Sequence, residues 1–291
     1  MPKKGFLSGN ALKLLGSVFM LIDHAGLLLF PSLPWLRIVG RLAFPIFAFM
    51  IAEGCLYTRN RRKHFLVIFA LGVLMQVVLY IATRMTSFSI FIIFSFSILL
   101  IYLLDATTDA MDAAIRRHPA QKARKAQEDV PGFPAQETAQ SQEVRDADRE
   151  NREENAGKIG AKRERPYDLL VAFWALLFIG LTTVLYVWCD QTTYFEANYG
   201  FFGILTPVAV YAARKYGGDY SFFFAFLALA LCNLVITQSS QFAIQHYALL
   251  AIPLLLCYNG EKGRYHLKYF FYLFYPLHIV VLEGIALLFF H

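Results

Sequence analysis

Long apolar runs separated by short polar segments make up most of this chain. A bilayer core about 30 Å thick needs roughly 20 apolar residues in a helix, and nine runs come close to that length or reach it. This pattern predicts an all-α, polytopic integral membrane protein with about nine transmembrane helices. The predicted spans are residues 11–30, 36–57, 64–83, 86–104, 167–189, 200–214, 219–237, 241–258 and 268–290.

The distribution of cations among the loops predicts the orientation. If the nine spans alternate, only Arg84 lies in the loops of one side, and the other side holds all the remaining loop cations outside residues 105–166. Cytoplasmic loops carry the excess of Lys and Arg, so we expect a cytoplasmic N-terminus that starts a retained first span. The cations assigned to the cytoplasm are Lys3, Lys4, Arg59, Arg61, Arg62, Lys63, Arg214, Lys215, Lys262, Arg264 and Lys268.

Charge is concentrated in one segment between the fourth and fifth spans. Residues 105–166 hold 12 of the 27 Lys and Arg and 13 of the 21 Asp and Glu. Too few apolar side chains are present there to offset the entropy of ordering. We expect a polar cytoplasmic linker that is disordered or a loose solvated helix, between membrane segments 1–104 and 167–291, which form one bundle.

Composition also excludes some classes of function. The chain is 57% hydrophobic and only 16% charged, which is a membrane composition. The sequence contains no basic stripe with interleaved aromatic residues, so nucleic-acid binding is not expected. The four cysteines are scattered without a repeated spacing, so neither a disulfide framework nor a metal site is expected.

Ionisable residues inside the spans are candidates for a site, because a charge in hydrocarbon costs about 2.5–3.5 kcal/mol on insertion scales. Asp23 and His24 are adjacent in the outer half of the first span. Arg41 lies near the outer end of the second span, one helical turn from Arg37, and His278 lies near the middle of the last. Neighbours on a helix point about 100° apart, so Asp23 and His24 need partners on different helices.

Each of these residues has a structural alternative. Asp23 either belongs to a site or only neutralises Arg41. His278, which follows Pro276, either joins the site or bonds to a carbonyl exposed by the proline. Glu53, near the inner surface, is expected to pair with the RNRRK loop. His24 is the strongest candidate for a general base, because histidine titrates near neutral pH.

The stretch 258-YNGEKG-263 is predicted to form a turn at the inner end of the eighth span. Backbone amides exposed by Asn-Gly, with the cations Lys262 and Arg264, could hold a phosphorylated cytoplasmic ligand. The alternative is a turn with the usual positive-inside cations.

Five stretches together resemble the TraX family, which takes its name from a conjugation protein required to acetylate the N-terminus of F-type pilin. The resemblance excludes the linker and the fourth span. In more distant relatives, which are polytopic membrane acyltransferases, an early-span histidine is regarded as catalytic. The stretches are 23-DHAG-26, 37-RIVGRLAFPIFAFMIAEGCLYTRN-60, 198-NYGFFGIL-205, 258-YNGEKG-263 and 268-KYFFYLFYPLHIVVLE-283.

The resemblance implies an acetyltransferase of the bacterial inner membrane that uses cytoplasmic acetyl-CoA and no metal. The acceptor would be a protein N-terminus such as that of pilin, a glycan or a lipid, next to membrane lipid. A proton-coupled transporter and a non-catalytic scaffold are the alternatives. The expected catalytic residues are His24, Asp23, Arg41 and His278, and the expected acetyl-CoA contacts are Tyr258, Asn259, Lys262 and Arg264.

Overall fold

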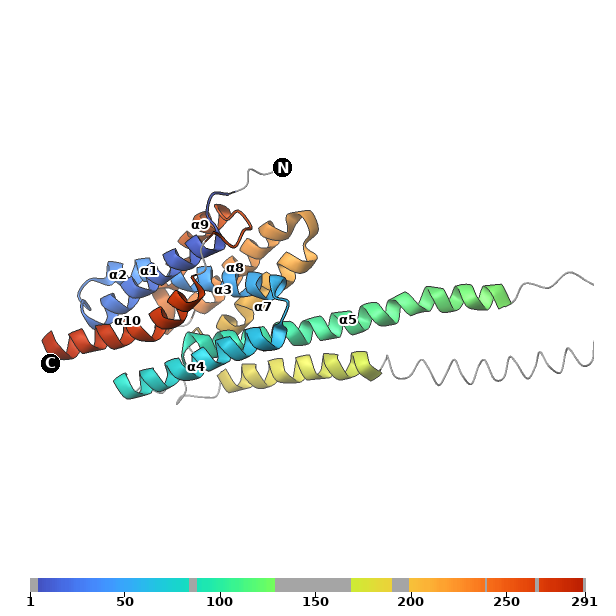
Figure 1. Ribbon diagram of the computed structural model, residues 1–291, viewed down its shortest axis with the longest axis horizontal. Coiled ribbons are helices and arrows are strands. Elements are labelled where there is room, and N and C mark those ends of the chain that lie inside the picture. Colours follow the sequence, from blue (N-terminus) through green and yellow to red (C-terminus); the bar gives the residue numbers. More distant parts are fainter. Residues whose placement is uncertain are drawn as a thin grey trace, which may run out of the picture. The chain divides into compact units, whose positions relative to one another are not determined.

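Helices form all the regular elements of the described residues of the computed structural model (Figure 1). The structure describes residues 5–83, 88–128, 169–189, 199–238, 240–264 and 267–289. Among these residues no strand longer than an isolated bridge occurs, and such a bridge joins Leu7 to Tyr258. The predicted all-α class is therefore confirmed.

Seven helical segments of the described chain are long and apolar enough to cross a bilayer. They coincide with seven of the nine predicted spans, so the multi-pass architecture is confirmed but the count of nine is not. At the other two positions lie α7 (Gly200–Tyr216), with 17 residues, and the adjoining η2 (Ser240–Ala251) and α9 (Ile252–Leu256). The seven segments are Gly9–Leu28, Pro34–Tyr57, Arg61–Ile81, Ile90–Ile115, Leu169–Cys189, Gly218–Thr237 and Tyr269–Phe289.

The second predicted span consists of two helices with a short break between them. Pro34 occupies the first turn of α2 (Pro34–Gly40), where its missing N–H removes no helical hydrogen bond. A turn at Arg41 and Leu42 then leads into α3 (Ala43–Tyr57). The break places Arg41 at the junction of two helices. The other labelled helices are α1 (Gly9–Leu28), α4 (Arg61–Thr83), α5 (Ile90–Glu128), η1 (Gly218–Tyr220), α8 (Ser221–Thr237) and α10 (Lys268–Phe289). A further helix, without a label, is Leu169–Cys189.

The chain divides into two compact units, one of Met1–Ile101 with Thr183–His291 and one of Tyr102–Thr182. In the second unit, α5 continues as a helix to Glu128, so the beginning of the predicted linker is helical. The rest of that linker, residues 129–166, lies outside the described residues. The buried cluster and the sites described below belong to the first unit.

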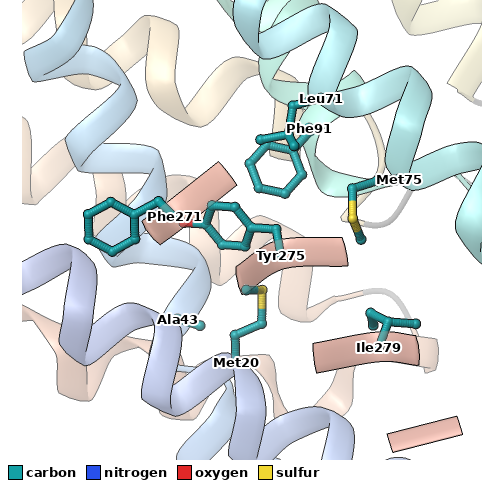
Figure 2. Packing of buried hydrophobic residues seen from close by; sticks show 8 residues of the cluster. All are labelled: Met20, Ala43, Leu71, Met75, Phe91, Phe271, Tyr275 and Ile279. Atoms are coloured by element: carbon teal, nitrogen blue, oxygen red, sulfur yellow. The ribbon is translucent and has the colours of Figure 1, made fainter. Parts of the chain in front are cut away.

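A cluster of buried apolar side chains joins five helices of the first unit (Figure 2). Figure 2 shows the side chain of Met20, from α1, directed toward Tyr275 of α10. The Tyr275 ring also packs edge-on against Phe91 of α5 and Phe47 of α3, with centroids 4.5 and 5.7 Å apart. The cluster comprises Met20, Ala43, Leu71, Met75, Phe91, Phe271, Tyr275 and Ile279.

Helix α1 carries Asp23 and His24 and packs against three other helices. It packs against α2, α3 and α10, and Figure 1 shows α1 in blue alongside α10 in red. Residues on different faces of α1 therefore meet different helices. This packing gives Asp23 and His24 separate environments.

Candidate functional site

The carboxylate of Asp23 is held between two guanidinium groups. Arg37 Nη1 donates to Asp23 Oδ2 at 2.7 Å and to the Asp23 backbone carbonyl at 3.2 Å. Arg41 Nη2 lies 3.2 Å from each carboxylate oxygen. Both arginines come from the α2 segment, which turns the i, i+4 spacing of Arg37 and Arg41 into a clamp on one face. The predicted Asp23–Arg41 pair is thus present, with Arg37 as an additional member.

Gly40 makes this close approach possible. A Cβ at position 40 would overlap the backbone and Cβ of Asp23. The absence of a side chain therefore lets α2 lie directly against α1 beside the ion pairs. Gly26 has a similar role on α1, where a Cβ would lie 2.7 Å from the Cβ of Leu36.

Tyr199 adds a hydroxyl to the same group from the start of α7. Arg41 Nη1 lies 3.5 Å from the Tyr199 hydroxyl, and the Tyr199 ring stacks on Phe44 with centroids 4.1 Å apart. The backbone of Tyr199 has a φ of 71°, the one positive φ outside glycine among the described residues. Such a conformation is strained for a bulky residue, so the surrounding packing holds the hydroxyl toward Arg41.

His24 points to a different helix, as its position next to Asp23 predicts. Its Nδ1 lies 3.2 Å from Nε2 of His278 on α10, and the ring centroids are 5.1 Å apart. His278 is 6% exposed and stacks on Phe274. The structure thus places all four residues expected in the catalytic group in two neighbouring pairs, Asp23 with Arg41 and His24 with His278.

The hydrogen bonds of this histidine pair determine its tautomers. Nδ1 of His278 lies 2.9 Å from the carbonyl oxygen of Phe274. A carbonyl can only accept, so Nδ1 of His278 carries the proton and Nε2 of the neutral ring is an acceptor. Nδ1 of His24 must then donate to it, which leaves the lone pair of His24 on Nε2. The bonded carbonyl belongs to Phe274, whereas the carbonyl that lies four residues before Pro276 is that of Tyr272.

A cavity of about 620 Å³ opens at the inner end of α1 and α3, toward the predicted cytoplasmic side. Three ammonium groups line it, those of Lys13, Lys63 and Lys262, together with the ring of His64. The cavity is therefore suited to an anionic ligand. Its other lining residues are Gly9, Met50, Glu53, Gly54, Tyr57, Thr58, Asn60, Val67, Ile68, Tyr258, Gly260 and Tyr272.

Glu53 contributes little negative charge to this cavity, because its carboxylate is paired. Its Oε1 accepts from Arg214 Nε at 2.6 Å, and the side chain is 2% exposed. Arg214 also donates to Ser221 and lies over the ring of Phe222. The expected pairing of Glu53 with the RNRRK loop is therefore wrong. The partner comes from the inner end of α7, which the packing of α7 on α3 brings alongside.

The four residues expected to contact acetyl-CoA separate into two groups. Tyr258 and Lys262 line the cavity, but Asn259 and Arg264 are not among its lining residues. Asn259 Oδ1 instead accepts from the Glu261 amide at 2.9 Å, and Arg264 is exposed. Burial, with the Glu53 carboxylate nearby, raises the pKa of Tyr258, so its phenol stays neutral.

The YNGEKG turn is fixed against the start of α1. The amides of Gly9 and Asn10 donate to the carbonyls of Glu261 and Lys262 at 2.8 and 3.0 Å. The Asn259 amide donates to Leu7 at 2.9 Å. These bonds satisfy orphan amides at the N-terminus of α1. The turn therefore positions Lys262 at the cavity.

Sequence reasoning left out several residues of these two sites. Lys13 and His64 were not singled out in their spans, although Lys13 shows one signal, a cation at the inner end of an apolar run. Arg37 has a clearer signal, its spacing of one turn from Arg41. Tyr199 could be found only through the glycine-flanked stretch that contains it. None of these signals identifies the partner.

An apolar layer separates the cavity from the histidine pair. Lys13 at the cavity and His24 are eleven residues apart on α1, which corresponds to about 16 Å of helix. Tyr272 and His278 are six residues apart on α10, or about 9 Å. Met20 and Tyr275 of the buried cluster lie between these levels. A ligand that extends from the cavity to His24 must displace or pass these two side chains.

Comparison with known proteins identifies one family model, described as the TraX protein, which matches residues 8–115 and 172–286. The match includes the fourth predicted span, so the expectation that this span lies outside the resemblance was wrong. No solved structure matches the chain.

Two curated proteins share shorter segments with this chain. A probable fimbrial assembly protein FimC, serogroup H1, of Dichelobacter nodosus is 34% identical over 73 residues, which is 24% of this chain and 30% of that protein. An uncharacterized protein of Rickettsia prowazekii (strain Madrid E) is 37% identical over 68 residues, which is 23% of this chain and 25% of that protein. The chain thus spans less than a third of either relative.

Proposed function

The chain belongs to the TraX family, and from that premise we propose that it is a membrane-embedded acetyltransferase. It moves an acetyl group from cytoplasmic acetyl-CoA to an amine or hydroxyl at or across the membrane. The observation that carries the proposal is the His24–His278 contact, which leaves the lone pair of the His24 ring on Nε2. The family membership and the cationic cavity support it independently.

His24 acts as the general base in this proposal. Its Nε2 takes the proton from the attacking amine or hydroxyl, and the bond from the acceptor atom to the acetyl carbon forms. The C–S bond of the thioester breaks, and the sulfur leaves as a thiolate that takes up a proton. His278 keeps the imidazole of His24 in the required tautomer. The guanidinium of Arg41 supplies positive charge for the oxyanion that develops on the acetyl oxygen.

The cavity is the proposed entrance for acetyl-CoA. Lys13, Lys63 and Lys262 provide positive charge for its phosphates at the inner end of the bundle, and charge-assisted hydrogen bonds to phosphate are stronger than neutral ones. Tyr258 adds a neutral hydroxyl. The acetyl-bearing arm then extends outward past Met20 and Tyr275. Asn259 and Arg264 remain proposed contacts at the edge of this entrance.

A pilin subunit's N-terminus is the acceptor that we propose first. The name of the fimbrial assembly relative supports it, as does the meaning of the TraX name. A glycan and a membrane lipid are the alternatives. An acceptor screen with radiolabelled acetyl-CoA distinguishes them, because the label moves to a pilin peptide, to a sugar or into the lipid fraction.

The first test compares wild type with His24→Ala in detergent, with release of CoA and the mass of the acceptor as measurements. Loss of a general base lowers turnover by about 10²–10⁴-fold, while stabilisation by CoA persists because the cavity is intact. His246→Ala is the matched control, since His246 is exposed and lies outside both sites. If His24→Ala turns over as fast as wild type, or if CoA does not bind, the proposal fails.

The proposed location is the bacterial inner membrane with the N-terminus in the cytoplasm. A single cysteine introduced as Arg62→Cys, in the exposed start of α4, should react with an impermeant maleimide only in inverted vesicles. Labelling in intact spheroplasts would reverse the orientation and place the cavity on the outer side.

A further inference from the structure

The ion-pair group around Asp23 carries more positive than negative charge. Two guanidinium groups, from Arg37 and Arg41, share one carboxylate. Arg41 is only 5% exposed, and its Nε has no hydrogen-bond partner among the described residues. A buried cation without full compensation is costly, above all in a membrane protein. An anionic ligand would balance both the charge and the unused donor.

Arg37 is placed to present that positive charge to a ligand. Its side chain is 27% exposed, in contrast to the enclosed Arg41. Its Nη1 donates to the Asp23 backbone carbonyl, whose carbon is bonded to the amide nitrogen of His24. The cation therefore lies next to the residue that carries the base.

We propose that Arg37 and Arg41 bind an acidic group of the acceptor, a carboxylate or a phosphate, and so hold its amine or hydroxyl beside His24. This inference rests on the proposed function and names the class of acceptor, an anionic one. Guanidinium groups suit this task because their planar donors match the oxygens of carboxylates and phosphates. The group is separate from the cavity, which takes the donor at the opposite end of α1.

The acceptor class is tested with two amines that differ in one acidic group, ethanolamine and O-phosphoethanolamine. Wild type should acetylate O-phosphoethanolamine with a KM about tenfold or more below that for ethanolamine. Arg37→Gln should remove this difference, so that its KM for O-phosphoethanolamine rises to that for ethanolamine. Arg59→Gln, at an exposed cytoplasmic arginine, should preserve the preference. Equal KM values for both amines in wild type would overturn the proposal while leaving the acetyltransferase function intact.

A binding measurement keeps the inference testable if no acetyl transfer is found. Inorganic phosphate should raise the Tm of Lys262→Gln, in which the cavity is weakened, and adding Arg37→Gln should abolish the shift. A shift that survives Arg37→Gln and disappears in Lys262→Gln would assign phosphate to the cavity alone and refute the inference. The same variants in nanodiscs of phosphatidylglycerol or phosphatidylcholine show whether the anion is a lipid headgroup. If it is, phosphatidylglycerol alone should give the Arg37-dependent rise in Tm without added phosphate.

A further variant excludes compensation from within the chain. Glu196 lies outside the described residues, three positions before Tyr199 in the sequence. Glu196→Gln should leave the phosphate-dependent shift unchanged. If this variant instead enhances phosphate binding strongly, Glu196 is the third partner of the arginines, and an acidic acceptor group is not required.

Discussion

The carboxylate of Asp23 should be among the most important single groups for the stability of the protein. Asp23→Asn keeps the size of the side chain but removes the charge between two guanidinium groups at 2.7 and 3.2 Å. Breaking a buried ion pair costs about 3–5 kcal/mol, because the remaining charges are left uncompensated. In a chain of this size each kcal/mol corresponds to about 2 °C, so the Tm should fall by about 6–10 °C.

The structure also predicts an asymmetry between the partners. Arg37→Gln leaves Asp23 and Arg41 balanced one to one, and the lost group is partly exposed, so it should cost about 1–2 kcal/mol. The double variant Asp23→Asn/Arg37→Gln leaves a single unpaired guanidinium. Its loss of unfolding free energy should therefore be smaller than the sum of the losses in the two single variants, by a coupling energy of about 0.5–3 kcal/mol.

Thermal unfolding in detergent, followed by tryptophan fluorescence, measures these differences. Asp219→Asn is the matched control, because Asp219 is an exposed acid in η1 and its loss should change the Tm by less than about 1 °C. The reasoning fails if Asp23→Asn behaves like this control. It also fails if the double variant shows no coupling, since the two charges would then act independently.

Three further changes test other regions of the structure. His278→Ala removes the acceptor for the neighbouring imidazole, and kcat should fall about 10²-fold with an unchanged KM for acetyl-CoA; a change in KM alone would contradict the tautomer assignment. Lys13→Gln and Lys262→Gln should each raise the CoA concentration for half-maximal thermal stabilisation about tenfold. Unchanged titrations would show that acetyl-CoA does not bind in the cavity. Gly40→Ala should lower the Tm by about 2–6 °C by forcing α1 and α2 apart, while Gly180→Ala, where a Cβ meets nothing within 4 Å, should not; equal shifts would disprove the close approach.

Helical periodicity carried much of the information about the site. The sequence alone shows that Asp23 and His24 lie on different faces of one helix and cannot share a partner there. With the alternating orientation, it also predicts Arg41 and His278 at similar depths. Both residues do meet this region of α1, because depth along a span follows from counting residues at a fixed rise.

Where sequence reasoning failed, the missing information was the rotation and packing of helices. Glu53 was matched to the nearest cations along the chain, but α7 packs on α3 and brings Arg214 to its carboxylate. The Asn-Gly turn and its cations also predicted Asn259 and Arg264 as ligand contacts, which stay predictions, but this pattern did not show that the backbone of the turn caps α1. Sequence distance is a poor guide to such pairs, because any two helices of a bundle can be neighbours.

By itself, the sequence determined the all-α membrane architecture, the orientation that we expect and the level of the ionisable residues. These properties follow from local composition and from the fixed geometry of a single helix. Only the tertiary structure decided that Arg37 joins Asp23, that Nδ1 of His24 meets Nε2 of His278, and that Lys13, Lys63 and Lys262 line one cavity. Each of these depends on atoms from separate helices approaching within a few ångströms, which is set by the packing of side chains between helices.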